Sequence, residues 1–135
     1  MRPEPTVVVA AIIHDGGRIL RTRRRPSIRA GGLWEFPGGK VEAGETAAVA
    51  LEREIREELN IGIRAGAVLC ETDTPTAAGV IRLVCMWATL EDAEPVLSTD
   101  HDLLEWVDPS SISPEGWCEP DWYAVGLLRS GATPD

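Results

Sequence analysis

The chain has 135 residues, of which 44% are hydrophobic, and this is the size and composition of one globular domain. No apolar run reaches the ~18–20 residues that cross a membrane, and the first residues lack the apolar segment of a secretion signal, so we expect a cytoplasmic protein without a membrane partner. The net charge of −9 argues against binding of a nucleic-acid polymer, which needs clustered Lys and Arg side chains. A small phosphorylated ligand that carries a divalent cation remains compatible with this charge.

The three cysteines, Cys70, Cys85 and Cys118, lie far apart, within or near apolar segments. Their odd number and wide spacing predict reduced, mostly packed thiols and not a disulfide framework. None of them has a His or Cys partner at the spacing of metal ligands.

The beginning of the chain has the pattern of strands and loops. Residues 7–13 are continuously apolar, which predicts a buried strand, and a polar turn leads from there into a returning arm at residues 18–23. Residues 26–32 have the composition of a loop, and residues 33–36 predict a short strand that Pro37 stops.

Arginines gather in the returning arm and in the loop after it, at positions 21, 23, 24, 25 and 29. Two interpretations of this cluster are open. It is either a solvated hairpin arm or a set of phosphate contacts, for which the forked guanidinium group is well suited.

An acidic helix is predicted from residue 47 onward, with Thr46 as its N-cap. Glu54, Glu57 and Glu58 share one face of this helix, beside an apolar stripe. Like charges at this spacing repel by roughly 0.2–0.5 kcal/mol per pair, which a bound divalent cation would offset. Oxygen ligands without a nearby His or Cys favour Mg²⁺ or Mn²⁺ over Zn²⁺. The alternative is a solvated acidic helix.

The second half of the chain predicts further strands and a last helix. Residues 63–72 and 80–90 read as two strands joined by a loop that contains Pro75 and Gly79. In order, the remaining segments are an irregular acidic stretch at 91–101, a strand at 103–107, a turn or short helix from Asp108, and a helix at 122–128. These elements predict a mixed sheet with a helix packed on either side.

The spacing around the acidic helix resembles the signature of the Nudix hydrolases, which is long and gapless. Where that family has Gly before the final aliphatic residue, this chain has Asn60, the next best residue for the left-handed conformation that follows a helix. The matching positions are Gly39, Glu45, Arg53, Glu54, Ile55, Glu57, Glu58 and Ile61. Residues 33–40 and 100–106 also follow the order seen in the MutT-like branch of this family. Within that branch, the chain most resembles the CTP pyrophosphohydrolases and 8-oxo-dGTP diphosphatases.

This resemblance implies one Nudix hydrolase domain over residues 1–135, an α/β fold in which a mixed β-sheet forms a three-layer α/β/α sandwich. It also implies Mg²⁺-dependent hydrolysis of a nucleoside triphosphate to the monophosphate and pyrophosphate, with CTP, a modified cytosine nucleotide or 8-oxo-dGTP as the favoured substrate. The role would be nucleotide pool sanitation or pyrimidine metabolism, by a monomer or a homodimer. Two alternatives stay open: hydrolysis of another nucleoside diphosphate derivative such as ADP-ribose, and a non-catalytic Nudix ligand-binding module.

The resemblance also implies roles for particular residues near the metal. Arg53 would orient the glutamates, and Glu54 would either bind a further metal or take a proton from the attacking water. We expect His101 to be a loop histidine, with a general base as the alternative. The implied metal ligands are the backbone carbonyl of Gly38 and the carboxylates of Glu54, Glu57, Glu58 and Asp100.

For the nucleotide, the resemblance implies a base pocket and a phosphate side. An ionised Asp121 would accept the amino group of cytosine, although the same residue is also a candidate N-cap of the last helix. Trp117 and Trp122 are either stacking platforms or packing residues. The implied substrate-binding residues are Glu35, Phe36, Leu83 and Asp121 for the base, and Arg24 and Arg29 for the phosphates.

Overall fold

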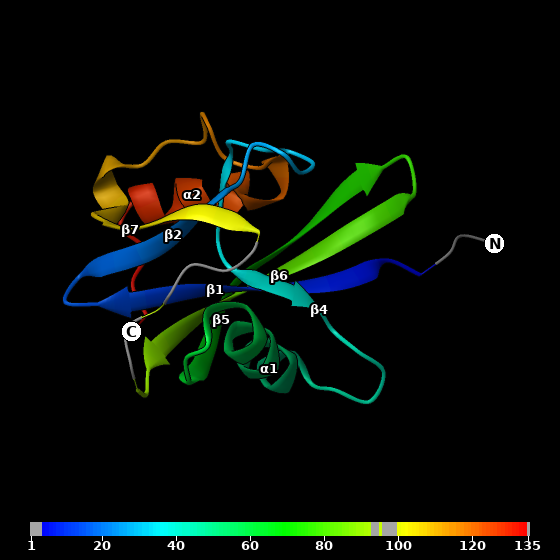
Figure 1. The fold of residues 1–135 in the computed structure, drawn as a ribbon, viewed down its shortest axis with the longest axis horizontal. Coiled ribbons are helices and arrows are strands. Elements are labelled where there is room, and N and C mark those ends of the chain that lie inside the picture. Colours follow the sequence, from blue (N-terminus) through cyan, green and yellow to red (C-terminus); the bar gives the residue numbers. More distant parts are fainter. Residues whose placement is uncertain (1–3, 93–94, 96–99, 135) are drawn as a thin grey trace.

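The computed structural model describes residues 4–92, 95 and 100–134, and Figure 1 shows how its elements are arranged. None of the helices in this part of the chain has the length and apolar character needed to cross a membrane. In chain order the elements are β1 Thr6–Asp15, β2 Arg18–Arg24, β3 Trp34–Glu35, β4 Gly38–Lys40, α1 Ala47–Leu59, β5 Ile63–Thr76, β6 Gly79–Leu90, β7 His101–Val107 and α2 Trp122–Arg129, with short 3-10 helices at Pro109–Ser111 and Glu119–Asp121.

β1 is the central strand of the sheet. The strand order is β3-β2-β1-β6-β5, with β4 also paired to β1 and β7 also paired to β2. β1 runs parallel to β6 and antiparallel to β2 and β4. The sheet is therefore mixed, as the sequence predicted.

A helix covers each face of this sheet, and β1 is apolar on both faces for that reason (Figure 1). Val9, Ala11 and Ile13 pack in the core beneath α1, whereas Ala10 and Ile12 pack in the core beneath α2. Because successive side chains of a strand point to opposite faces, a strand buried on both faces has a continuous apolar sequence. The predicted three-layer α/β/α arrangement is confirmed.

The helix α1 begins and ends as the sequence predicted. The hydroxyl of Thr46 accepts a hydrogen bond from the Val49 N–H at 3.2 Å, and Asn60 has the left-handed conformation, with φ 56° and ψ 37°. The apolar stripe is completely buried at Leu51, Ile55 and Leu59. Burial of this stripe fixes the rotation of the helix and leaves its acidic face directed away from the core.

The hairpin of β5 and β6 is longer than predicted. The expected loop around Pro75 and Gly79 is wrong, because both residues belong to the strands and only residues 77–78 form the turn. Proline is tolerated there because β5 is an edge strand, on which a missing N–H donor removes no ladder bond. The Thr76 hydroxyl donates to the Gly79 carbonyl at 2.7 Å and closes the turn.

β7 also begins earlier than predicted, at His101 and not at residue 103, because His101 pairs with Arg24 of β2. A register shift between Arg23 and Arg24 accommodates this pair. Of the stretch that we expected to be irregular, residues 93–94 and 96–99 lie outside the described residues.

We expect Thr46→Ala to lower the free energy of unfolding by about 1 kcal/mol, because it leaves an N–H at the start of α1 without its acceptor. Urea denaturation of the metal-free protein measures this loss. Thr46→Ser keeps the hydroxyl and serves as the control. If Thr46→Ala is as stable as Thr46→Ser, the cap contributes nothing to the fold.

Candidate active site

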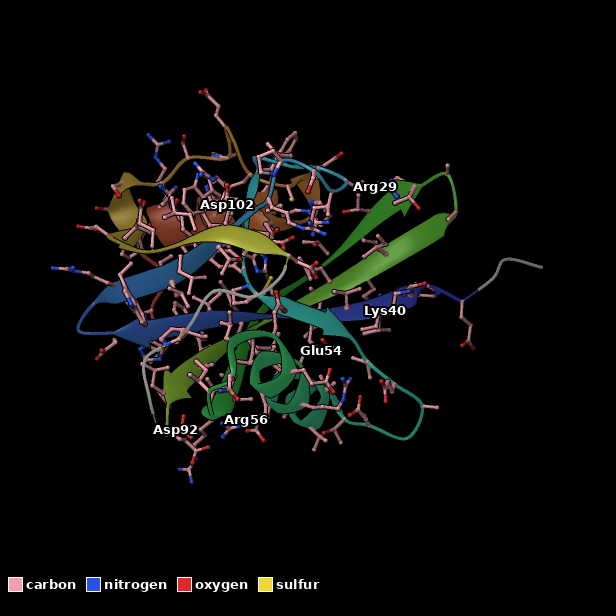
Figure 2. All side chains as sticks on the ribbon, viewed as in Figure 1. Arg29, Lys40, Glu54, Arg56, Asp92 and Asp102 are labelled. Atoms are coloured by element: carbon pink, nitrogen blue, oxygen red, sulfur yellow. The ribbon has the colours of Figure 1, made fainter. Side chains whose placement is uncertain are left out.

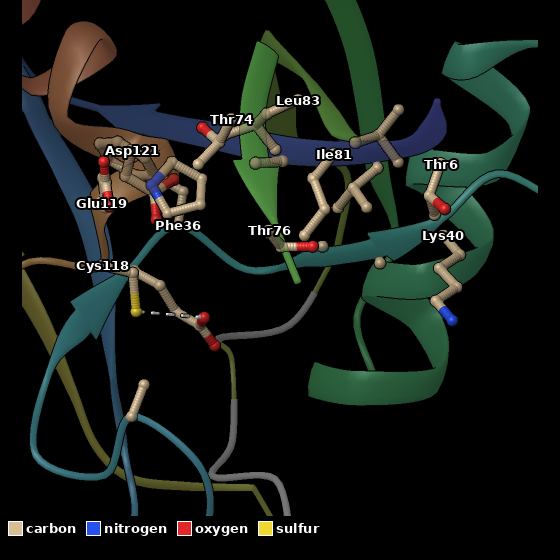
Figure 3. A pocket seen from close by; sticks show the side chains of 18 of the residues that line it. Thr6, Phe36, Lys40, Thr74, Thr76, Ile81, Leu83, Cys118, Glu119 and Asp121 are labelled. Atoms are coloured by element: carbon tan, nitrogen blue, oxygen red, sulfur yellow. Dashed lines mark hydrogen bonds between the residues drawn. The ribbon is translucent and has the colours of Figure 1, made fainter. Parts of the chain in front are cut away.

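A cleft of about 1260 Å³ lies between the loop at residues 24–33, the β4–α1 segment and the β5–β6 hairpin. Figure 3 shows Phe36 and Asp121 at one end of this cleft and Thr6 and Lys40 at the other. All but one of the predicted site residues line it, although they come from distant parts of the chain. These are Arg24, Arg29, Glu35, Phe36, Gly38, Glu54, Glu57, Glu58, Leu83, Asp100 and Asp121.

The exception is Arg53, which lies beside the cleft. It contacts the acidic wall of the cleft, which consists of Glu54, Glu57 and Glu58 on α1. Its guanidinium group donates to Glu45 at 2.7 and 2.9 Å, to the Lys40 carbonyl at 3.0 Å and to Glu54 at 3.0 Å. Its contact with Glu57, one turn further along the helix, is longer, at 3.3 Å. Arg53 therefore ties the loop before α1 to the acidic face of the helix.

The strongest of these contacts is the two-pronged pair between Arg53 and Glu45. The hydrogen bonds from Arg53 lower the pKa of the Glu45 carboxyl to about 2. In turn, Glu45 raises the pKa of Arg53 above its ordinary value. Both groups are thus charged throughout the physiological range, and the pair is a fixed part of the site.

The backbone of β4 directs two carbonyl groups, those of Gly38 and Lys40, toward the helix α1. The Pro37 carbonyl accepts from the Ala11 N–H of β1, whereas the Lys40 carbonyl points away from β1 and accepts from Arg53. Hydrogen-bonding groups alternate between the two edges of a strand. The Gly38 carbonyl therefore lies on the same edge as that of Lys40, facing the acidic helix.

Gly39 leaves the space that Glu54 occupies. A Cβ atom at this position would overlap the Glu54 carboxyl group. Glu54 consequently packs directly against the backbone of β4, where Arg53 holds it from the other side. A glycine at position 39 is thus needed so that the Glu54 carboxylate can take this position.

Glu58 is held differently, by a buried histidine. The His101 Nδ1 atom lies 3.1 Å from Glu58 Oε1, and Nε2 lies 2.8 Å from Glu35 Oε2. Burial raises the pKa of Glu58 to about 7. The expectation that His101 is a loop histidine is wrong, because its side chain is completely buried at the beginning of β7.

At the other end of the cleft, Asp121 does not cap the last helix. Its side chain is buried and accepts a hydrogen bond from the Phe36 N–H, and it makes no capping bond to α2. Burial raises the pKa of Asp121 well above its ordinary value, and the neighbouring Glu35 adds to this effect. Burial thus disfavours the ionised form of Asp121 that we expected from the sequence.

Neither of the two tryptophans that flank Asp121 in the sequence lines the cleft. Trp117 is buried with its ring centroid 4.7 Å from that of Phe36. Trp122 donates its indole N–H to the Trp117 carbonyl at 2.9 Å. Trp117 thus packs behind Phe36, whereas Trp122 is 47% exposed.

The arginine cluster divides into two groups. Arg21 and Arg23 pair with Glu105 and Asp102 of β7 and so stiffen the hairpin arm. Figure 2 shows Asp102 on the other side of the sheet's β4 strand from Glu54. Arg24 and Arg29 belong to the loop that lines the cleft. Arg21 and Arg23 thus belong to the hairpin arm, whereas phosphate contact by Arg24 and Arg29 stays a prediction.

Arg24 is the better anchored of the two cleft arginines. Its Nη1 atom lies 3.3 Å from both carboxylate oxygens of Glu35, and its Nε donates to the Arg29 carbonyl at 2.7 Å. Glu35 therefore joins Arg24 to His101 and is a central connection of the site. We had expected Glu35 only as a contact to the base.

Several cleft residues carry no signal in the sequence. Thr74 and Thr76 lie beyond the predicted end of their strand, and they line the cleft together with Ile81 of β6 (Figure 3). Cys118 approaches Glu35 with its Sγ 3.9 Å from Oε1, and burial raises the pKa of this thiol to about 12. All three cysteines are free thiols, as expected.

The donor atoms at the acidic wall suit a hard divalent cation. The groups are carboxylates and one outward-facing carbonyl, and oxygen ligands of this kind are preferred by Mg²⁺ and Mn²⁺. The glycine that admits Glu54 to the wall removes the steric obstacle to a compact ligand set. Asp100, which directly precedes His101 in the chain, lines the same cleft.

Comparison with known proteins agrees with this geometry. The NUDIX domain matches residues 3–126. The chain belongs to the Nudix family. It is a Nudix hydrolase, and enzymes of this family generally use a divalent metal and act on small nucleotide substrates.

Individual relatives share about a third of their residues with this Nudix hydrolase. It is 37% identical to the CTP pyrophosphohydrolase of Escherichia coli (strain K12) over 102 residues, which cover 76% of this chain and 75% of the relative. It is 36% identical to the putative 8-oxo-dGTP diphosphatase 2 of Mycobacterium tuberculosis (strain ATCC 25618 / H37Rv), over 96% of this chain and 94% of the relative. The crystal structure of the MutT NUDIX hydrolase from Burkholderia pseudomallei superposes with a TM-score of 0.79 at 30% identity, covering 97% of this chain and all of that one.

The Glu45 and Arg53 pair predicts a pH-dependent stability. The pKa of Glu45 in the folded protein, about 2, lies below the ordinary value of 4.5, so the pair stabilises the fold above pH 4.5 and this contribution is lost as the pH falls toward 2. We expect Glu45→Gln to have a lower Tm than the wild type at pH 7, and the difference to shrink below pH 4.5.

Thermal denaturation between pH 3 and pH 7 measures this difference. Glu42→Gln is the matched control, because Glu42 is exposed and lies 3.8 Å from the same arginine. A Glu45→Gln protein with the same Tm deficit at every pH would contradict the assignment of the stability to the ion pair.

Proposed function

We propose that this Nudix hydrolase is a Mg²⁺-dependent nucleoside triphosphate pyrophosphohydrolase that converts a (d)NTP and water to the (d)NMP and pyrophosphate. Mn²⁺ is a second suitable cation. The observation that carries the proposal is one cleft with an oxygen-rich acidic wall, Glu54, Glu57 and Glu58, near a pocket formed by Phe36 and Asp121. This spacing suits a ligand with several phosphates at one end and a base at the other.

Hydrolysis needs charge neutralisation, an oriented phosphate chain and a group that accepts a proton. The bound cation would supply neutralisation of the phosphate charge, held by the Gly38 carbonyl and the carboxylates of Glu54, Glu57 and Glu58, with Asp100 as a further candidate. Arg24 and Arg29 would orient the phosphates from the facing loop. Arg53 keeps Glu54 in place by its hydrogen bond at 3.0 Å.

Within this arrangement Glu54 is the group best placed to take the proton from the attacking water. Attack of that water on phosphorus breaks one phosphoanhydride bond and releases the monophosphate and pyrophosphate. Glu54 touches both β4 and Arg53, so its carboxylate is held in one orientation before the substrate binds. Such preorganisation lowers the cost of reaching the transition state.

The burial of Asp121, which favours its protonated form, changes the argument about the base. An ionised carboxylate would only accept hydrogen bonds, but a protonated carboxyl group offers both a donor and an acceptor. It therefore fits cytosine, with its amino donor and ring acceptor, as well as oxidised guanine, and the earlier preference for cytosine loses this support. CTP, modified cytosine nucleotides and 8-oxo-dGTP remain the proposed substrates, with Leu83 and Phe36 as apolar contacts.

Two other functions are less well supported. Hydrolysis of a nucleoside diphosphate derivative such as ADP-ribose uses the same acidic wall. A non-catalytic binding module does not need the complete set of glutamates with the Arg53 network that holds them. A cytoplasmic location, a role in nucleotide pool sanitation and a monomeric or homodimeric state remain part of the proposal.

We expect Glu54→Gln and Glu58→Gln to reduce turnover by at least a hundredfold while the fold survives, because each removes the charge of a cleft carboxylate. Pyrophosphate release from CTP and 8-oxo-dGTP, measured with Mg²⁺ and with EDTA, provides the assay. A Glu58→Gln protein with wild-type turnover would refute the proposed role of the acidic wall.

Mg²⁺ should raise the Tm of the wild type, with a gain that grows with the ratio of free metal to its Kd. The cation binds the folded state, in which the carboxylates are gathered, and not the unfolded chain. A titration of Tm from micromolar to millimolar Mg²⁺ measures this gain, and Glu58→Gln should shift the curve to higher metal concentration. A flat curve with and without a non-hydrolysable nucleotide speaks against a metal site.

Asp121→Ala should cost roughly 1–3 kcal/mol in kcat/KM for the preferred nucleotide and much less for poor substrates. Asp121→Asn retains one donor and one acceptor and should keep the order of preference among the nucleotides. Steady-state kinetics on a panel of canonical and oxidised nucleotides distinguishes these outcomes. Equal losses on every nucleotide would assign Asp121 to the structure of the pocket and not to base recognition.

A further inference from the structure

The imidazole ring of His101 connects two carboxylates that come from different layers of the protein. Nδ1 lies 3.1 Å from Glu58 on α1, and Nε2 lies 2.8 Å from Glu35 on β3. The ring is completely buried, whereas Glu58 and Glu35 keep 15% and 20% of their side-chain surface exposed. His101 thus stands behind the carboxylates, and the carboxylates face the cleft.

The backbone fixes His101 at this point. The register shift in β2 lets His101 pair with Arg24, and the Arg25 N–H donates to the Asp100 carbonyl at 3.0 Å. The ring position is therefore set by strand pairing between β2 and β7. A buried ring that is fixed in this way can impose its geometry on the longer and more flexible side chain of Glu58.

The three glutamates of α1 differ in how they are held. Glu54 is bonded to Arg53 at 3.0 Å, and Glu57 is 61% exposed with a longer contact to the same arginine. Glu58 instead has Oε1 directed at His101. Glu58 thus lines the cleft while one of its oxygens is directed at the ring.

We propose that His101 is a positioning residue, which holds Glu58 in its metal-facing orientation and joins it to Glu35 at the nucleotide end of the cleft. This inference rests on the proposed function, because it takes Glu58 as a metal ligand. His101 itself does not bind the cation. Both of its ring nitrogens lie within hydrogen-bond distance of a carboxylate oxygen.

Two amide substitutions separate the two contacts of the ring. The side-chain nitrogen of asparagine lies near the position of Nδ1 and retains a donor toward Glu58. The nitrogen of glutamine reaches the position of Nε2 and retains a donor toward Glu35. His101→Asn and His101→Gln thus form a matched pair of the same chemistry.

For His101→Gln we expect Mg²⁺ affinity and kcat each to fall by roughly tenfold or more, with KM changed much less, since outer contacts of metal ligands contribute about 10–100-fold. His101→Asn should lose at least fivefold less than His101→Gln in both quantities. Mg²⁺ affinity is measured by calorimetry without nucleotide, and the Tm in EDTA reports whether each variant is folded. Equal losses in the two variants, or a milder effect in His101→Gln, would overturn the inference.

If both variants fail to fold, the ring can be observed in the wild type. The chain has two histidines, so His14→Asn assigns the imidazole ¹⁵N resonances. Mg²⁺ should shift Nδ1 of His101 more than Nε2, because Glu58 changes its charge environment on binding the cation. Saturating Mg²⁺ that leaves Nδ1 unchanged would overturn the inference.

Failure of the proposed function is distinguishable from failure of this inference. If the wild type neither binds Mg²⁺ nor hydrolyses nucleotides with it, the proposed function fails before any variant is compared. If the wild type and Glu58→Gln behave as proposed but the two His101 variants are equivalent, only the positioning role of His101 fails.

Discussion

Electrostatic repulsion among the gathered carboxylates is the constraint that shapes this site. The ligand atoms of Glu35, Glu58 and His101 lie within 4.8 Å of one another, and two ionised carboxylates at such a separation repel by about 3–4 kcal/mol at an effective dielectric of about 20. The fold must hold these groups together without neutralising all of them. Arg53 and His101 accomplish this from opposite sides, each bonded to one part of the acidic wall.

The other elements of the fold bring Arg53 and His101 to the acidic wall. Burial of the apolar stripe on α1 aims the acidic face toward β4, and the pairing of β4 with β1 brings the Gly38 and Gly39 backbone against it. The pairing of β7 with β2 delivers His101 from the far end of the sequence. The site therefore depends on two separate strand pairings around one helix, and each can be disturbed without changing a carboxylate.

The sequence predicted the parts of the site that depend on local spacing. Glu54, Glu57 and Glu58 share a helix face because of the 3.6-residue period, and Thr46 and Asn60 mark the ends of that helix by their own chemistry. The apolar run of β1 similarly indicated a strand covered on both faces.

The features that sequence reasoning missed depend on contacts between distant residues. His101 meets Glu35 across 66 positions, through a register shift that no local pattern records. The raised pKa of Asp121 follows from its burial, which the cap-like sequence around it did not indicate. Pro75 suggested a loop because the edge position of β5, which tolerates proline, is a property of the sheet and not of the segment.

The central claim is that the acidic wall of α1, with the backbone of β4, holds a divalent cation while His101 stays behind it. Anomalous diffraction from crystals soaked in Mn²⁺ with a non-hydrolysable nucleoside triphosphate tests this claim directly. The account predicts manganese peaks bounded by Glu54, Glu58 and the Gly38 carbonyl, with the His101 ring still between Glu58 and Glu35. A manganese ion bonded to His101, or no peak at the acidic wall with nucleotide bound, would contradict it.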